Sequence, residues 1–190
     1  LRMISQSARA RGLSVLLRIH SHSDYHRGWR LGHSSKVLDK WIGKSVVTVR
    51  APFANWVSAT ERQFVVTGLG DWLERTNRFL DDYSKLPVFR FEDIVSAPET
   101  GLDELGNALG LHARSKNLAS VNMPSISGDN REKEPITGDG FVLRDKKRLA
   151  DIRSSSAWAA EAYTHISKLN ELEERLGYPL TREEDLALGG

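Results

Sequence analysis

The chain contains no cysteine among its 190 residues. This absence excludes disulfide bonds, thiolate metal sites and a cysteine nucleophile, and it fits a reducing compartment such as the cytoplasm. No apolar run approaches the roughly 18 residues that a membrane-spanning helix needs, so the sequence predicts no membrane span. A formal net charge of only +2 gives no argument for nucleic acid as a partner.

The composition that remains is that of an ordinary globular protein. Hydrophobic residues make up 39% and charged residues 27% of the chain, and this length suits one domain with its own core. The opening segment LRMISQSARARG is basic but has no apolar centre, so it does not resemble a signal peptide. There is no internal repeat, and the sequence predicts a single domain over residues 1–190.

Three short apolar segments are predicted to be buried strands. They are LSVLLRIH at 13–20, KSVVTVR at 44–50 and LPVFRFED at 86–93. Strands of this kind, separated by helices, predict a three-layer α/β fold with a mostly parallel sheet. In such sheets ligands bind at the carboxyl ends of the strands.

Helices are predicted between and after these strands from apolar spacing and from signals at their ends. Pro52 suits the first turn of a helix that continues through ANWVSATERQF. Ser96 and Glu99 form a capping-box pattern for a helix that Gly110 ends, and Gly177 ends the last helix. The other predicted ranges are helices at 35–43, 71–84 and 145–176, and a long flexible loop at 119–140.

Each predicted strand ends in polar or charged residues, which parallel strands would bring to one edge of the sheet. These residues are Arg18 and His20, then Arg50, then Arg90, Glu92 and Asp93. Arg50 also stands at the start of a helix, whose N-terminus already carries partial positive charge. The sequence therefore predicts that an anion binds at this edge.

Arg50 and Ser58 are the candidate anion ligands. Arginine offers a permanently charged fork of donors that matches phosphate, and serine adds a neutral donor. A rise of about 1.5 Å per residue puts Ser58 roughly 10 Å along the helix from Arg50, within reach of one shared phosphate if the arginine folds alongside. In the alternative interpretation, Arg50 pairs with a carboxylate such as Asp93 and Ser58 only packs.

Three segments of the sequence resemble a known family. VTVRAPFANWVSATER looks like the 3′-phosphate-binding segment of the sulfotransferases that use 3′-phosphoadenosine 5′-phosphosulfate, with a serine eight positions after the arginine. VFRFEDIVSAPETGLDELGNALGL is similar to the RYEDL segment of that family, and ELEERLGYPL looks like its LLERLGY ending. The resemblance implies a P-loop NTPase-like sulfotransferase fold and a sulfotransferase activity that leaves adenosine 3′,5′-bisphosphate.

The resemblance also implies catalytic roles for Arg18 and His20. His20 stands where the family has a histidine at a strand end, and it would take the proton of the acceptor hydroxyl. Arg18 would neutralise the charge that develops on the sulfonate. The loop also holds His22, His26 and His33, any of which could be the base instead, and no metal site is predicted.

A late basic loop would cover the 3′-phosphate in such an enzyme. Arg131, Lys133 and Arg144 are the candidates here, and the alternative is a loop of solvated charges. The acceptor would be a small molecule or an oligosaccharide, with a carbohydrate hydroxyl favoured, and a homodimer is left open.

The sequence departs from the family in two places. The Gly- and Ser-rich loop that cradles the 5′-phosphosulfate is missing, so we expect an N-terminal segment to precede Leu1. The tyrosine of RYEDL is Phe91, which lacks a hydroxyl. The alternative function is a non-catalytic nucleotide-binding relative or a P-loop kinase-like protein.

Overall fold

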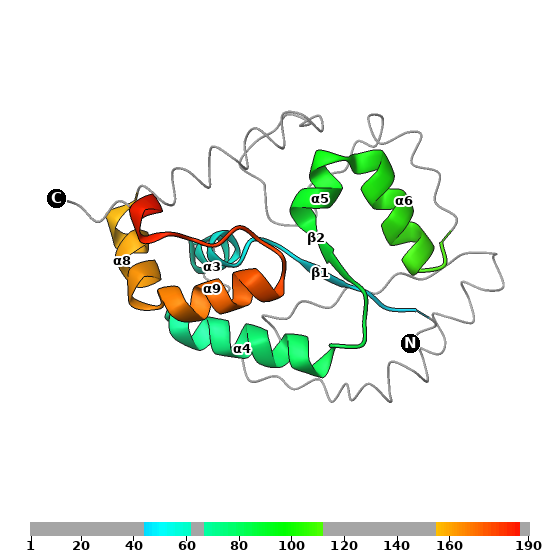
Figure 1. Ribbon diagram of the computed structural model, residues 1–190. Helices are drawn as coiled ribbons and strands as arrows, with labels where there is room; N and C mark the ends of the chain where they lie inside the picture. Colours follow the sequence, from blue (N-terminus) through cyan, green and yellow to red (C-terminus); the bar gives the residue numbers. More distant parts are fainter. Residues whose placement is uncertain (1–43, 62–66, 112–154, 187–190) are drawn as a thin grey trace.

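The structure is a computed structural model, and it describes residues 44–61, 67–111 and 155–186. The elements in this part of the chain are coloured along the sequence in Figure 1. They are β1 (Val47–Val49), α3 (Pro52–Glu61), α4 (Leu69–Asp82), β2 (Val88–Arg90), α5 (Phe91–Ser96), α6 (Pro98–Ala108), α8 (Ser156–Thr164), α9 (Ile166–Arg175) and the short 3₁₀ helix η3 (Glu183–Asp185). The predicted strand at 13–20, helix at 35–43 and loop at 119–140 lie outside the described residues.

β1 and β2 form a small parallel sheet. Val47 is opposite Val88, and Val49 is opposite Arg90. The described part is mostly helical around this two-stranded sheet, which agrees with the predicted α/β class. The parallel register brings the carboxyl ends of both strands to the same edge, where Arg90 is opposite Val49 and Arg50 is the next residue along.

The predicted strand at 86–93 is wrong in its second half, because the helix α5 begins at Phe91. Glu92 and Asp93 lie in the first turn of α5, where carboxylates are favoured by the partial positive charge of a helix N-terminus. The predicted capping box is also wrong. Ala97 is the N-cap residue of α6 with Pro98 next to it, and the Ser96 hydroxyl donates instead to the Asp93 carbonyl oxygen, 3.1 Å away.

Several predicted helix ends are confirmed. Pro52 is the first residue of α3, and Gly110 and Gly177 have φ values of 67° and 71° just beyond α6 and α9, a conformation that costs glycine little. The described part of the helix predicted at 145–176 is two helices, because His165 leaves helical geometry between α8 and α9.

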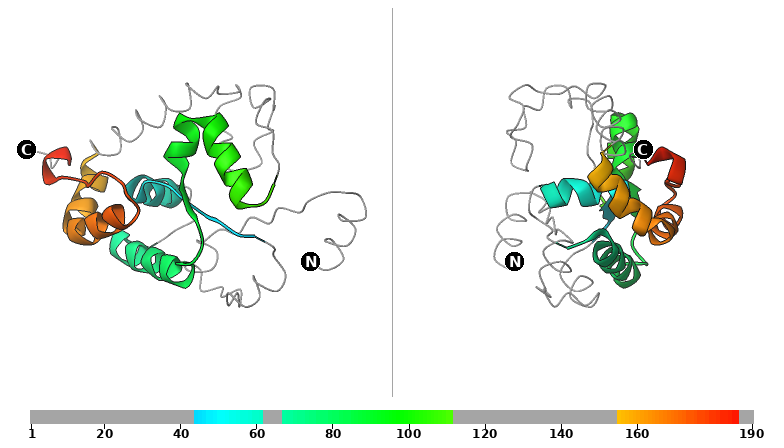
Figure 2. Two further views of the ribbon diagram at one scale, coloured as in Figure 1. Left: turned by 45° about the vertical axis from the view of Figure 1, so that its right-hand side comes forward. Right: turned by 90° about the vertical axis from the view of Figure 1, so that its left-hand side faces the viewer.

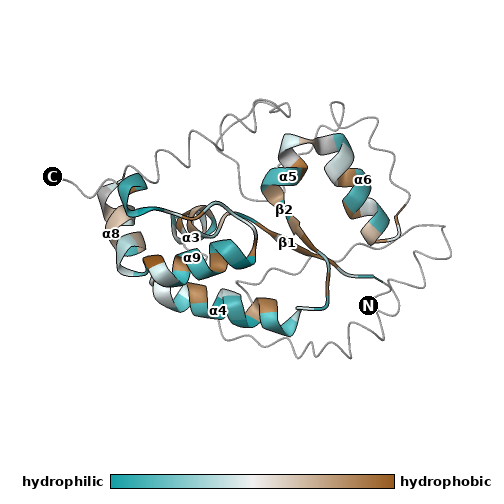
Figure 3. Ribbon diagram, viewed as in Figure 1, coloured by the Kyte–Doolittle hydropathy of each residue, from teal (hydrophilic) through white to brown (hydrophobic). Residues whose placement is uncertain are grey.

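The core lies among α3, α4, α8 and α9. Figure 3 shows apolar residues along the inward sides of α4 and α9 and polar residues on their outward sides. Trp56 of α3 contacts Trp158 of α8 edge to face, with ring centroids 5.2 Å apart, and it donates from Nε1 to the Thr67 carbonyl oxygen. The fully buried leucines of this core are Leu69, Leu73, Leu169 and Leu172.

α5 and α6 pack on each other and stand apart from this four-helix group (Figures 1 and 2). β2 links them to α4, and its partner β1 leads into α3. The two strands therefore hold a helical group on one side and a helix pair on the other. α3 follows the carboxyl end of β1, and α5 follows the carboxyl end of β2.

Candidate functional site

The junction between β1 and α3 is held by two residues in the first turn of α5, Phe91 and Glu92. The Ala51 N–H, directly after Arg50, donates to Glu92 Oε1 at 2.9 Å. The Arg50 guanidinium lies over the Phe91 ring, with Cζ 5.5 Å from the ring centroid, in cation–π geometry. Phe91 therefore offers its ring face to the Arg50 guanidinium.

Ser58 lies in the second half of α3. Phe53, Trp56 and Val57 are buried in the core, and Ser58 is half-buried beside them. Positions three and four apart lie on one helix face, so Ser58 lies on the same face as Ala54 and Ala51. Ala51, at the start of this face, is the residue directly after Arg50.

Arg90, at the end of β2, holds two other segments. Its Nε and Nη2 donate to the two oxygens of Asp93, at 2.7 and 2.9 Å, and its Nη1 donates to the Gly177 carbonyl oxygen. The hydrogen bonds to Asp93 raise the pKa of Arg90 above its ordinary value. The carboxylate that the sequence offered as a partner for Arg50 is thus bound through both oxygens by Arg90.

Tyr178 completes the group. Its hydroxyl donates to Glu92 Oε2 at 2.6 Å, and its ring lies 5.5 Å from Arg90 Cζ. Burial, and then the bond to Glu92, raise the pKa of Tyr178 well above its ordinary value. The hydroxyl therefore keeps its proton across the physiological range and remains a donor.

We call Arg50, Arg90, Glu92, Asp93 and Tyr178 the strand-end cluster. It contains at least one residue from each of three segments, VTVRAPFANWVSATER, VFRFEDIVSAPETGLDELGNALGL and ELEERLGYPL. The sequence pattern predicts Arg50, Arg90, Glu92 and Asp93 at one edge of the sheet, but it predicts no role for Glu92 or Tyr178. A sequence signal exists for both residues, because Glu92 and Tyr178 each lie inside one of these three segments.

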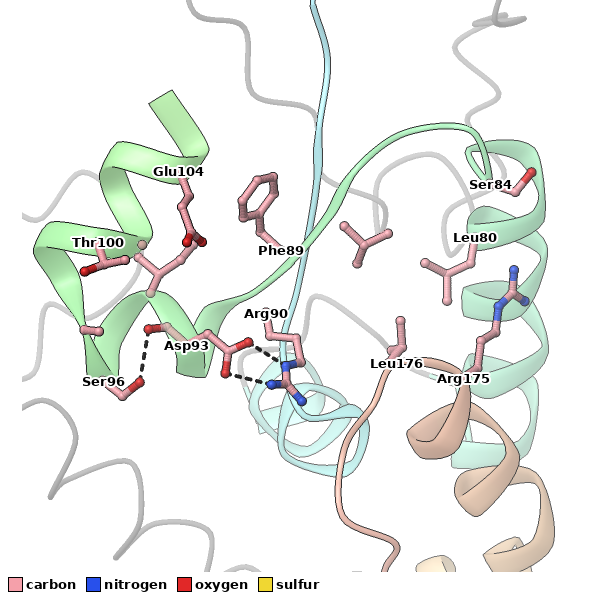
Figure 4. A pocket seen from close by; sticks show the side chains of 14 residues that line it. Leu80, Ser84, Phe89, Arg90, Asp93, Ser96, Thr100, Glu104, Arg175 and Leu176 are labelled. Carbon is pink, nitrogen blue, oxygen red and sulfur yellow. Dashed lines mark hydrogen bonds and ion pairs between the residues drawn. The ribbon is translucent and has the colours of Figure 1, made fainter. Parts of the chain in front are cut away.

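A separate cavity of 640 Å³ opens beside β2 (Figure 4). Thr100 and Glu104 of α6 line one wall, and Leu80 of α4 and Leu176 line the other. Its volume is in the range of small-molecule sites. Arg90 and Asp93 belong both to its lining and to the strand-end cluster, whereas Arg50 and Ser58 do not line it. The cavity therefore adjoins the strand-end cluster through Arg90 and Asp93.

The remaining predicted site residues lie outside the described residues. They are Arg18, His20, Arg131, Lys133 and Arg144, together with His22, His26 and His33 as alternative bases. Within residues 44–61, 67–111 and 155–186, no three histidine, aspartate or glutamate side chains are grouped to hold a metal ion. The same ranges contain no helix that is long and apolar enough to span a membrane.

Comparison with known proteins gives no relative for this chain. No protein-family model, no curated protein and no solved structure matches it.

Proposed function

We propose that the chain is a sulfotransferase that moves the sulfuryl group of 3′-phosphoadenosine 5′-phosphosulfate to an acceptor hydroxyl, and that Arg50 and Ser58 hold the 3′-phosphate. The guanidinium of Arg50 would bind the phosphate as a charged fork, and the Ser58 hydroxyl would add one donor. Since Ala51 already donates to Glu92, side chains rather than the Ala51 N–H would carry the phosphate.

One observation carries the proposal: the three segments that resemble the family contact one another. Glu92 of the second segment bonds to Ala51 of the first and to Tyr178 of the third. Arg90 bonds to the Gly177 carbonyl. Unrelated short resemblances, separated by tens of residues, have no reason to converge at one sheet edge. Their convergence supports reading them as parts of one site.

In the proposed reaction, His20 takes the proton of the acceptor hydroxyl as its oxygen attacks sulfur. The bond between sulfur and the phosphate oxygen breaks, and adenosine 3′,5′-bisphosphate leaves. Arg18 would offset the charge on the transferring group, and Arg131, Lys133 and Arg144 would cover the 3′-phosphate. A carbohydrate hydroxyl as acceptor, a cytoplasmic location and a homodimer stay predictions.

Calorimetry with adenosine 3′,5′-bisphosphate and with ATP tests the nucleotide part of the proposal. We expect binding of the first and none of the second. Arg50→Ala should weaken binding by about tenfold to a hundredfold, the usual cost of losing hydrogen bonds from a charged group. Ser58→Ala should weaken it by a few-fold, about the value of one neutral hydrogen bond.

Arg182→Ala is the matched control. The Arg182 side chain is 72% exposed and pairs with Glu184 on the surface, a contact that contributes little free energy, so its loss should leave nucleotide affinity unchanged. Full affinity in Arg50→Ala would remove Arg50 from the site. Preference for ATP would favour the kinase-like alternative. Nucleotide binding without sulfate transfer by the intact polypeptide would favour the non-catalytic relative.

A further inference from the structure

The Glu92 side chain joins two segments that are far from it in the sequence. Oε1 accepts the Ala51 N–H, 41 positions away, and Oε2 accepts the Tyr178 hydroxyl, 86 positions away. Both carboxylate oxygens are engaged, and each bond comes from a different direction. Because Glu92 lies in the first turn of α5, its own backbone is held by the helix.

The bond to Ala51 acts on Arg50. The Ala51 nitrogen belongs to the planar peptide group that begins at the Arg50 carbonyl. Since β1 holds the residues before Arg50, fixing this N–H restrains the ψ angle of Arg50, and with it the direction of the Arg50 Cα–Cβ bond relative to α3. The Phe91 ring, one residue before Glu92, lies under the guanidinium at the other end of the same side chain.

Tyr178 limits the freedom of Glu92. A glutamate held by one oxygen alone could turn about its side-chain bonds, which cluster in several staggered rotamers. The Tyr178 hydroxyl, 2.6 Å from Oε2, removes that freedom. Tyr178 is itself fixed, because Arg90 holds the carbonyl of the preceding Gly177 and lies near the Tyr178 ring.

We propose that Glu92 and Tyr178 are positioning residues for nucleotide binding, through which the turn after α9 sets the orientation of Arg50. The inference rests on the proposed function, since it explains how the phosphate ligand of that site is held in place. Neither side chain would touch the nucleotide. Each would act on affinity only through the Ala51 N–H and the Arg50 backbone.

Calorimetry of the full chain with adenosine 3′,5′-bisphosphate tests this role. Tyr178→Phe keeps the ring near Arg90 and removes only the hydroxyl. We expect it to weaken binding by about threefold to tenfold, less than the loss of a direct bond to a charged group. Hydrogen exchange of the Ala51 amide should become faster in the same variant, because its acceptor is no longer held.

Two substitutions of Glu92 test the acceptor oxygen independently of Tyr178→Phe. Glu92→Gln retains an amide oxygen for the Ala51 N–H, whereas Glu92→Ala removes the acceptor. Glu92→Gln should therefore bind the nucleotide more tightly than Glu92→Ala does. Equal affinity in these two variants would contradict a role for the acceptor oxygen.

Thr181→Val separates positioning from general stability. The Thr181 hydroxyl donates to Glu173 at 2.8 Å, in the same C-terminal segment as Tyr178 but on a different carboxylate. This variant should lose stability and keep its nucleotide affinity. Tyr163→Phe, which removes an exposed hydroxyl on α8, should change neither.

Two results would overturn the inference while leaving the proposed function in place. One is wild-type affinity in Tyr178→Phe, and the other is an equal loss of affinity in Thr181→Val. In both cases the wild-type chain binds adenosine 3′,5′-bisphosphate, so the proposed function stands. If the wild-type chain itself does not bind adenosine 3′,5′-bisphosphate, the proposed function fails and the positioning role falls with it.

Discussion

Glu173 is a charged residue placed inside the core, where it is only 3% exposed. Its carboxylate accepts the Thr181 N–H at 2.7 Å and the Thr181 hydroxyl at 2.8 Å. Thr181 is buried as well. A buried carboxylate is tolerated when its oxygens are hydrogen-bonded, and here the bonds tie the end of α9 to the segment that follows it.

Replacing Glu173 with alanine should lower the free energy of unfolding by about 2–6 kcal/mol. The substitution leaves two buried donors of Thr181 without this acceptor, and each such group costs about 1–3 kcal/mol. Urea unfolding measures the loss. Glu173→Gln keeps one acceptor oxygen and should lose less, and Glu174→Ala, at the exposed neighbouring position, should be near neutral. A cost for Glu174→Ala equal to that of Glu173→Ala would contradict the prediction.

Neighbouring residues in the FRFED segment contact different partners. Arg90 binds Asp93 and the Gly177 carbonyl, Phe91 lies under Arg50, and Glu92 bonds to Ala51 and Tyr178. The change from β2 to α5 within this segment turns successive side chains toward different partners. Three adjacent residues, Arg90, Phe91 and Glu92, therefore connect this segment to two other parts of the chain.

At the scale of elements, the start of α4 is packed against the break between α8 and α9. Glu161 of α8 accepts the Leu69 N–H at 2.9 Å, which satisfies a donor in the first turn of α4. The His165 ring covers Gly70. A Cβ placed on Gly70 would lie 2.7 Å from His165 Cε1, so only glycine fits under the ring in this arrangement.

Gly70→Ala should destabilise the protein by about 1 kcal/mol or more, the usual cost of overpacking, because the His165 ring must move. In a His165→Ala background the sign should reverse. Alanine then meets no ring and gains up to about 1 kcal/mol of helix propensity over glycine. Thermal unfolding of the two single variants and the double variant measures this coupling. An equal cost in both backgrounds would show that His165 does not oppose the new methyl group.

At the scale of the whole molecule, the core joins the beginning and the end of the described chain. Val47 of β1 and Leu186, after η3, belong to the same buried cluster as the leucines of α4 and α9. The segment that follows α9 is therefore part of the core and not an appendage. Hydrogen bonds attach it to the rest of the chain, among them Gly177 to Arg90, Tyr178 to Glu92, and Thr181 to Glu173.

Leu186→Ala should lower the free energy of unfolding by about 2–4 kcal/mol, as expected for a buried leucine. Leu186 is 4% exposed. Leu180→Ala is the matched control in the same segment, since Leu180 is 48% exposed and surface substitutions cost about 0.5 kcal/mol or less. Chemical denaturation of both variants gives the comparison. Similar small losses would mean that the C-terminal segment does not contribute to the core.

The sequence alone determined the features that depend on neighbouring residues. The start of α3 at Pro52, the glycine ends after α6 and α9, and the apolar faces of α4 and α9 were all predicted. Each follows from a local rule: proline fixes φ, glycine accepts positive φ, and apolar residues repeat at the helical period. The grouping of charged residues at one edge of the sheet followed from the alternation of strands with helices, which predicts parallel strands.

Only the tertiary structure decided which partner each of those charged residues has. Asp93 binds Arg90, Glu92 bonds to Ala51 and Tyr178, and His165 interrupts the last helix above Gly70. These outcomes depend on contacts across tens of residues, and local propensity cannot choose among several carboxylates near one arginine. Hydrogen-bond geometry and packing make that choice, because they require the partners to be in the same place.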